Sequence, residues 1–208
     1  MSNHSNINRR ELLRYALFLA GATATTGCSF SDLTKTSKGD TKFLKQKHLA
    51  TLFSLADTLI PVTDTPGAIA AGVPDALDAM LLKWASPETR KLITKALDRL
   101  DEQSKSISGK SFHRLPSAEQ KEFLIEHDKM SLQPIPAPQN APQVRSLTPK
   151  IYVVDEGYHR LKNLIITLYY TSEIGMTQEL VYEHIPGKWI PSLKITPGMR
   201  PFASPTLF

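Results

Sequence analysis

Residues 168–189 read LYYTSEIGMTQELVYEHIPGKW, a stretch that sets aromatic rings among residues that end helices. An apolar helix from Tyr158 to Tyr170 is predicted to lead into it. Thr171 and Ser172 can then hydrogen-bond the local backbone and stop that helix, and Gly175 can take a positive φ. The pattern therefore predicts a rigid, bent corner at this point of the chain.

Beyond the bend, the sequence predicts a short second helix from Gln178 to Glu183. Thr177 is its expected N-cap, and Pro186-Gly187 is its expected end. Two interpretations of the rings are open, because large aromatic area on a rigid corner suits docking onto another protein but equally suits closure of the chain's own core. The residues predicted to form a partner interface are Tyr169, Tyr170, Ser172, Glu173, Gly175, Tyr182, Pro186, Gly187 and Trp189.

The first 28 residues have the layout of an export signal. Arg9 and Arg10 stand before two leucines, and an apolar run from Tyr15 to Gly27 follows. The adjacent arginine pair resembles the twin-arginine signal, which is read by the receptor of the translocon. The apolar run is too short for a comfortable transmembrane helix. The alternative is an amphipathic N-terminal helix that stays attached.

Cys28, the only cysteine, stands where this apolar run ends. A single cysteine excludes an internal disulfide and a four-cysteine zinc site. Thr26-Gly27-Cys28 resembles the end of a bacterial lipoprotein box, although Thr25 stands where that box usually carries leucine. A lipidated Cys28 would hold the protein at a membrane surface. The alternative is ordinary cleavage near this point, and in either case residues 29–40 are interpreted as a polar tether.

The remainder of the chain is predicted to be all-α, a small irregular helical bundle spanning residues 41–195. Apolar residues recur at helical spacing through most of it, interrupted by proline and glycine. The expected helices run from Asp40 or Thr41 to Ile60, from Pro74 to Trp84, from Pro87 to just before Gly109, and from a capping box at Ser117–Gln120 through His127. In the second of these helices, the predicted buried face is Leu77, Met80, Leu81 and Trp84.

Two proline-rich segments interrupt or follow this bundle. Residues 134–149 carry five of the fifteen prolines, which excludes a helix and predicts an extended surface loop. The loop is long for a compact domain, so two interpretations are open: an insertion that another protein holds in place, and plain disorder. Residues 196–208 are expected to form an extended C-terminal arm, whose Phe202 and Phe208 would be costly to leave in water.

The charge and the motifs of this chain do not support binding of nucleic acid, of nucleotides or of a metal ion. The formal charge of +5 falls to +3 without residues 1–27, too weak and dispersed for nucleic acid. The sequence contains no GxGxxG, no Walker pattern and no HExxH. Asp57, Asp64, Asp75 and Asp78 lie close in sequence without the alternation of a calcium loop. No metal or cofactor site and no catalytic residue is predicted. The neighbourhood worth testing for an enzyme is Glu173, His159 and Asp155.

Two blocks of sequence together resemble one family. The first runs from Leu52 to Pro61 and continues through DTPGA, Asp64–Ala68, to Val73. The second is YTSEIG, Tyr170–Gly175, followed by Glu179-Leu180, Tyr182 and Ile185-Pro186-Gly187. With the twin-arginine leader, they look like the subunit 3 family, the small subunit of gluconate 2-dehydrogenase. The resemblance covers about residues 45–195.

This resemblance implies a partner. Such small subunits accompany a large periplasmic flavoprotein dehydrogenase of the glucose–methanol–choline type, which holds FAD and oxidises a sugar, sugar acid or alcohol. A cytochrome c subunit with haem c often completes the complex, and the twin-arginine leader of the small subunit exports the folded pair. We therefore expect a non-catalytic accessory subunit with no cofactor of its own. The alternatives are a free-standing, membrane-tethered lipoprotein with a structural role and an enzyme with a site near Glu173 and His159.

Overall fold

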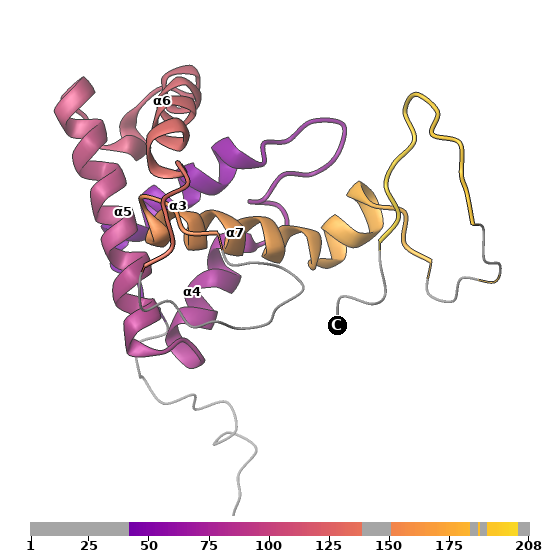
Figure 1. Cartoon of the computed structure of the whole chain (residues 1–208), viewed down its shortest axis with the longest axis horizontal. Coiled ribbons are helices and arrows are strands. Elements are labelled where there is room, and N and C mark those ends of the chain that lie inside the picture. The colour runs from indigo at the N-terminus through magenta and orange to yellow at the C-terminus, as the bar shows by residue number, and fades with distance from the viewer. Residues whose placement is uncertain (1–41, 139–150, 184–186, 188–190, 204–208) are drawn as a thin grey trace, which may run out of the picture. The chain divides into compact units, whose positions relative to one another are not determined.

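The structure is a computed structural model, and it describes residues 42–138, 151–183, 187 and 191–203 (Figure 1). Helices make up most of this part of the chain, and β-pairing there is limited to two isolated bridges, Pro134 to Val153 and Val181 to Phe202. The all-α prediction is therefore confirmed for the described residues. The elements are α3 (Gln46–Leu59), α4 (Val73–Lys83), α5 (Pro87–Ser108), the 3₁₀-helix η1 (Phe112–Arg114), α6 (Ser117–Ser131), α7 (Glu156–Tyr170) and the π-helical turn η2 (Gly175–Glu179).

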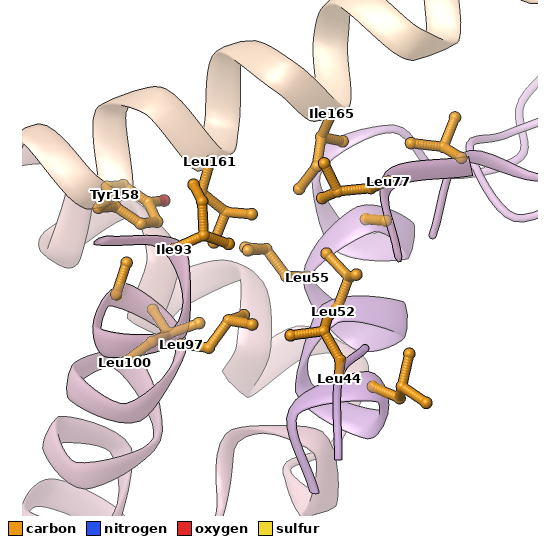
Figure 2. Close-up of a cluster of buried hydrophobic side chains, with 14 of the residues drawn as sticks. Leu44, Leu52, Leu55, Leu77, Ile93, Leu97, Leu100, Tyr158, Leu161 and Ile165 are labelled. Atoms are coloured by element: carbon orange, nitrogen blue, oxygen red, sulfur yellow. The ribbon is translucent and has the colours of Figure 1, made fainter. Parts of the chain in front are cut away.

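The core lies where α7 packs against α4 and α5 and where α3 packs against α4, α5 and η1. Leucine and isoleucine side chains from these helices point toward one another in Figure 2, and Tyr158 lies beside them. Burying each such side chain contributes about 1.5–3 kcal/mol. On α7 the large buried side chains recur at helical spacing and are Tyr158, Leu161, Ile165 and Tyr169.

Local sequence signals set several helix ends as predicted. Ser86 caps α5, because its hydroxyl oxygen accepts a hydrogen bond from the Thr89 N–H at 3.2 Å. The cap of α7 was not predicted: Asp155 accepts from the Tyr158 N–H at 2.9 Å, and the helix begins at Glu156, two residues before the expected Tyr158. The α3 helix ends at Leu59, two residues before Pro61, and α5 ends before Gly109. These ends depend on side chains close in sequence, which is why sequence alone predicts them.

The start of α3 differs from the prediction. It begins at Gln46 rather than at Asp40 or Thr41, and those two residues lie outside the described part of the chain. The buried Asp78 carboxylate on α4 accepts the backbone N–H of Leu44 at 2.7 Å and that of Phe43 at 3.2 Å. Asp78, which is distant in sequence, therefore accepts hydrogen bonds from the two backbone N–H groups that precede α3.

The prediction that Trp84 is buried is wrong. Leu77 and Leu81 are buried as expected, but Trp84 is 81% exposed. Since α4 ends at Lys83, Trp84 has a non-helical φ of −126° and no longer lies on the buried helical face. Helical periodicity predicts a face only as far as the helix continues.

The predicted capping box of α6 is also wrong. Ser117 is the first helical residue, and Pro116, at the N-cap position, provides no side-chain cap. Gln120 points into the protein instead of back to the helix start. Its amide nitrogen donates to the carbonyl oxygens of Phe112 and Leu115 at 3.1 and 3.0 Å, and its oxygen accepts from the Thr58 hydroxyl at 3.0 Å. Tertiary hydrogen bonds outweigh the local motif here.

The two proline-rich segments are only partly described. Residues 139–150 of the loop lie outside the described part, while its two ends pair through the Ile135 N–H and the Tyr152 carbonyl at 2.9 Å. In the tail, the Val181 N–H donates to the Pro201 carbonyl and the Ala203 N–H to the Val181 carbonyl, both at 2.9 Å. The backbone around Phe202 therefore pairs with this chain itself. Phe208 lies outside the described residues.

None of the described helices combines the length and the apolar composition that crossing a membrane requires.

Replacing Asp78 by alanine tests the anchor at the start of α3. We expect the free energy of unfolding to fall by about 1–3 kcal/mol, because two backbone donors lose a buried, charged acceptor. Denaturant unfolding measures this change. Asp75→Ala on the same helix removes only an exposed ion pair with Lys42 and should cost less than about 1 kcal/mol. Equal losses in the two variants would contradict the assigned role of Asp78.

Candidate functional site

The two sequence blocks meet in one place, between the turn at residues 61–67 and the segment 169–183, which we call the corner segment. The Tyr169 hydroxyl donates to the Pro66 carbonyl oxygen at 2.8 Å across 103 positions of sequence. The Thr65 hydroxyl donates to the Glu179 carboxylate across 114 positions. The tertiary structure therefore joins the two blocks into a single continuous site.

Thr171 and Ser172 end α7 as predicted. The Thr171 hydroxyl donates to the Thr167 carbonyl at 2.8 Å, which keeps its side chain on the last helical turn. The Ser172 hydroxyl donates to the Tyr169 carbonyl at 2.6 Å and accepts from the Gly175 N–H at 3.0 Å. One serine side chain thus bonds both a carbonyl and an N–H of the backbone at the bend.

The reason for a glycine at position 175 differs from the prediction. The glycines with positive φ in the described residues are Gly72, Gly109 and Gly198, so a left-handed Gly175 is wrong. A Cβ atom at Gly175 would instead lie 2.0 Å from the Tyr169 carbonyl oxygen. Glycine is therefore required at this position because the backbone of Tyr169 approaches it too closely for a side chain.

The predicted helix from Gln178 to Glu183 is wrong as well. The chain forms the π-helical turn η2, closed by a hydrogen bond from the Leu180 N–H to the Gly175 carbonyl at 3.0 Å. Thr177 lies inside this turn, and its hydroxyl donates to the Glu173 carbonyl at 2.7 Å instead of capping a helix. Leu180 is already extended, because the next residue pairs with the C-terminal segment.

The predicted interface residues separate into buried and exposed groups. Tyr169 is 2% exposed, so its ring closes the core and is not displayed to a partner. Gly175 is buried and Ser172 is half-buried, so both shape the bend. The exposed members are Tyr170 at 42%, Tyr182 at 43%, Glu173 and Gly187. Pro186 and Trp189 lie outside the described residues.

Tyr170 is an exposed ring with a rigid support. Its ring meets that of Tyr169 edge to face, with centroids 5.2 Å apart. Because Tyr169 is held in the core and bonded to Pro66, the position of Tyr170 is restricted before any partner binds. Little side-chain entropy would then be lost on docking.

Arg200, a residue that the sequence gave no reason to single out, closes the site from the C-terminal side. Its guanidinium donates to the Gln178 carbonyl and lies 3.3 Å from an Asp64 carboxylate oxygen. A hydrogen bond from the Thr63 hydroxyl, the Asp64 backbone N–H and the Arg200 charge together lower the pKa of Asp64. The turn, the corner segment and the tail are thus joined by polar contacts.

The neighbourhood proposed for an enzyme does not assemble. Asp155 and His159 lie at the start of α7, whereas Glu173 follows its end, and at 1.5 Å per residue the helix separates them by about 20 Å. Asp155 forms a two-point contact with Arg99, at 2.5 and 2.8 Å. His159 lies 3.1 Å from the Asn163 amide nitrogen. Asp155 and His159 are thus engaged by different structural contacts, and Glu173 lies away from both.

A buried polar cluster between α5, α6 and α7 also escaped the sequence reasoning. His127 is 2% exposed, with Nδ1 at 2.7 Å from the Gln103 side-chain oxygen and Nε2 at 3.2 Å from the Ser131 hydroxyl. Burial lowers the pKa of His127, which favours the neutral ring, and burial together with Asp128 raises the pKa of Tyr158. The Tyr158 hydroxyl donates to Asp128 at 2.7 Å. These groups satisfy one another within the packing and stabilise it.

The four aspartates close in sequence serve separate contacts. Asp78 accepts backbone N–H groups, Asp64 meets Arg200, Asp75 lies 3.6 Å from Lys42, and Asp57 is exposed. Among the described residues, no three histidine, cysteine, aspartate or glutamate side chains are grouped so that they could hold a metal ion.

Replacing Gly175 by alanine should distort the corner. The added methyl group meets the Tyr169 carbonyl at 2.0 Å, so the backbone must move, and we expect the free energy of unfolding to fall by about 1–3 kcal/mol. Gly187→Ala is the matched control, because no heavy atom lies within 4 Å of its new Cβ, and it should change stability by less than about 0.5 kcal/mol. Thermal and denaturant unfolding measure both variants. Full stability in Gly175→Ala would show that the close approach is not required.

A family model described as Gluconate 2-dehydrogenase subunit 3 matches residues 46–187, from the first residue of α3 to four residues beyond the corner segment. The match therefore includes both blocks that meet at the site. No curated protein and no solved structure gives a significant match. Since the family model covers more than half of its residues, the chain belongs to the gluconate 2-dehydrogenase subunit 3 family, the family of a subunit of a dehydrogenase complex.

Proposed function

We propose that this chain is the non-catalytic small subunit of a periplasmic, FAD-dependent dehydrogenase of the glucose–methanol–choline type. In this proposal it exports, assembles and stabilises a large flavoprotein subunit that oxidises a sugar, a sugar acid or an alcohol. The observation that carries the proposal is the family match over residues 46–187, which spans both halves of the site.

The reactive groups are proposed to belong to the partners. The large subunit holds FAD, and a cytochrome c subunit, where present, holds haem c. Two features of this chain support the division: two buried groups with shifted pKa values, His127 and Tyr158, are enclosed by the packing, and Glu173 lies far from His159. A group that cannot reach a substrate contributes to structure rather than to chemistry.

The exposed part of the corner segment is the proposed contact with the large subunit. Tyr170, Tyr182, Glu173 and Gly187 would touch the partner, together with Pro186 and Trp189, for which the sequence is the support. Tyr169, Ser172 and Gly175 would hold the shape of that surface from within. Aromatic rings fixed before binding are the usual anchors of protein interfaces.

Export is proposed to follow from the leader. Arg9 and Arg10 would address the folded pair to the twin-arginine translocon, and Cys28 would either receive a lipid or be removed by cleavage. A lipidated Cys28 would tether the complex to the membrane on the periplasmic side. The partner then needs no export signal of its own.

Replacing Arg9 and Arg10 together by lysine tests the export role. We expect the flavoprotein to remain in the cytoplasm, because the translocon receptor reads the arginine pair, and periplasmic FAD fluorescence should fall at least about tenfold. Arg14→Lys is the matched control and should leave the partner's location unchanged. Unaltered partner export in the double variant would refute the carrier role.

Replacing Tyr170 by alanine tests the docking role. Loss of a central aromatic anchor should weaken the complex with the flavoprotein at least about tenfold, measured as the yield of flavoprotein that co-purifies from the periplasm. Thr167→Ala, an exposed change one turn earlier on α7, is the control and should leave the yield unchanged. If this chain purifies alone even in its natural form, the proposed subunit role fails.

A further inference from the structure

We propose that the groove between the end of α5 and the length of α6 is a docking site for a basic, amphipathic helix of a partner protein. This groove, called here the α5–α6 groove, has a volume of about 310 Å³. It lies apart from the corner segment, and the inference goes beyond the proposed function because it does not depend on which dehydrogenase subunit is present.

The base and one wall of the α5–α6 groove are apolar. Phe123 and Leu115 line it from α6 and from the connector before α6, and Ile107 lines it from the last turn of α5. Leu115 is buried, whereas Ile107 is 71% exposed, which leaves a large apolar side chain in water beside the groove. Such exposure costs free energy that a bound apolar surface would recover.

The groove has little freedom to collapse or rearrange. The Phe123 ring stacks on His127, with centroids 5.8 Å apart at an interplanar angle of 13°, and it meets Phe112 at 5.7 Å. Phe112 is itself fully buried, and Gln120 holds the connector through its backbone carbonyls. A helix docking here would therefore meet a preformed surface, which lowers the entropic cost of binding.

Three carboxylates form the other wall. Glu119, Glu122 and Glu126 line the groove from α6 and are exposed. Their spacing of three and four residues places them on one face of the helix, along about 10 Å of its axis. A lysine or arginine series at the same spacing on a helix laid along α6 would meet each carboxylate in turn.

Helix stability alone does not explain this pattern. Glu119 lies in the first turn of α6, where it interacts favourably with the helix dipole. Glu122 and Glu126 lie beyond that turn, and the ion pair between Glu126 and Lys129 is exposed and so contributes little. Acidic side chains beside a solvent-exposed apolar groove are better explained by a partner that carries apolar and basic side chains at matching positions.

The same charges decide against the other classes of partner. An anionic lipid surface or a nucleic acid would bring negative charge against three glutamates, which is unfavourable. A helix with leucines at i, i+3, i+4 and i+7 and lysines or arginines along one border satisfies both walls. The occupant is therefore assigned as a basic amphipathic protein helix.

The test titrates the full chain with a fluorescently labelled leucine–lysine peptide of about 18 residues, which is about five helical turns. A second peptide has every lysine replaced by glutamate. We expect anisotropy to report binding of the leucine–lysine peptide alone, with an affinity that falls as salt is raised from about 0.05 to about 0.5 M. Equal binding of the two peptides, or no binding of either, would overturn the inference.

Variants then locate the binding. Glu119→Gln combined with Glu122→Gln should weaken the peptide about tenfold, and Ile107→Ser should weaken it by a similar factor. The matched controls are Glu102→Gln, an exposed glutamate of α5 outside the groove, and Val62→Ser, a side chain 68% exposed on the 61–67 turn. Both controls should bind as the natural chain does. Equal weakening by groove and control variants would overturn the assignment to this groove.

Two further outcomes distinguish this inference from self-association of the chain and from the proposed function. If Ile107→Ser abolishes self-association measured by sedimentation while the natural chain ignores the peptide, the groove binds a second copy and the inference fails. If the flavoprotein co-purifies normally but the peptide does not bind, the groove inference fails while the proposed function stands. Unchanged unfolding midpoints in all variants establish that the losses of affinity are local.

Discussion

The hydrogen bond from the Tyr169 hydroxyl to the Pro66 carbonyl is the contact on which the shape of the site depends. A single neutral hydrogen bond contributes only about 0.5–1.5 kcal/mol, so its importance is geometric. It joins the end of α7 to the turn after α3, and the contact between Thr65 and Glu179 repeats that connection. Backbone also approaches backbone closely inside each segment, at Gly67 beside Ile60–Val62 and at Gly175 beside Tyr169, which restricts the shape of each segment.

Around this contact, buried polar groups are used to build structure. Asp78 holds the segment before α3, Gln120 holds the connector before α6, and Asp155 joins α7 to Arg99 on α5. Burial alone would raise the pKa of Asp155, but the Arg99 guanidinium and the Tyr158 N–H outweigh it and lower that pKa. Buried polar side chains of this kind specify one packing arrangement, because each has its partners only there. A subunit whose surface must fit other proteins depends on such rigidity.

Much of the fold was predictable from local patterns. The boundaries of α5, the cap at Asp155 and the helix stop at Thr171-Ser172 depend on side chains within a few residues of the atoms they bond. Two of the wrong predictions extend a local sequence pattern beyond the residues to which it applies. Trp84 continues a helical period beyond the end of its helix, and Gln120 of the Ser117–Gln120 motif accepts from the Thr58 hydroxyl, 62 positions away, instead of bonding the start of α6. In the site, Tyr169 continues the helical spacing of the buried residues of α7 and is buried, whereas Tyr170, the next residue, is exposed.

From its residues alone, this chain could be recognised as helical, as lacking the usual motifs for binding nucleotides, and as similar to a dehydrogenase subunit, since composition, periodicity and short motifs carry that information. The meeting of Pro66 with Tyr169, of Asp64 with Arg200, and of three glutamates with Ile107 was decided by tertiary structure. These pairs are far apart in the chain or on different elements, so their proximity depends on how the helices pack against one another. Local sequence patterns extend over only a few residues, and a site assembled from distant segments lies beyond their range.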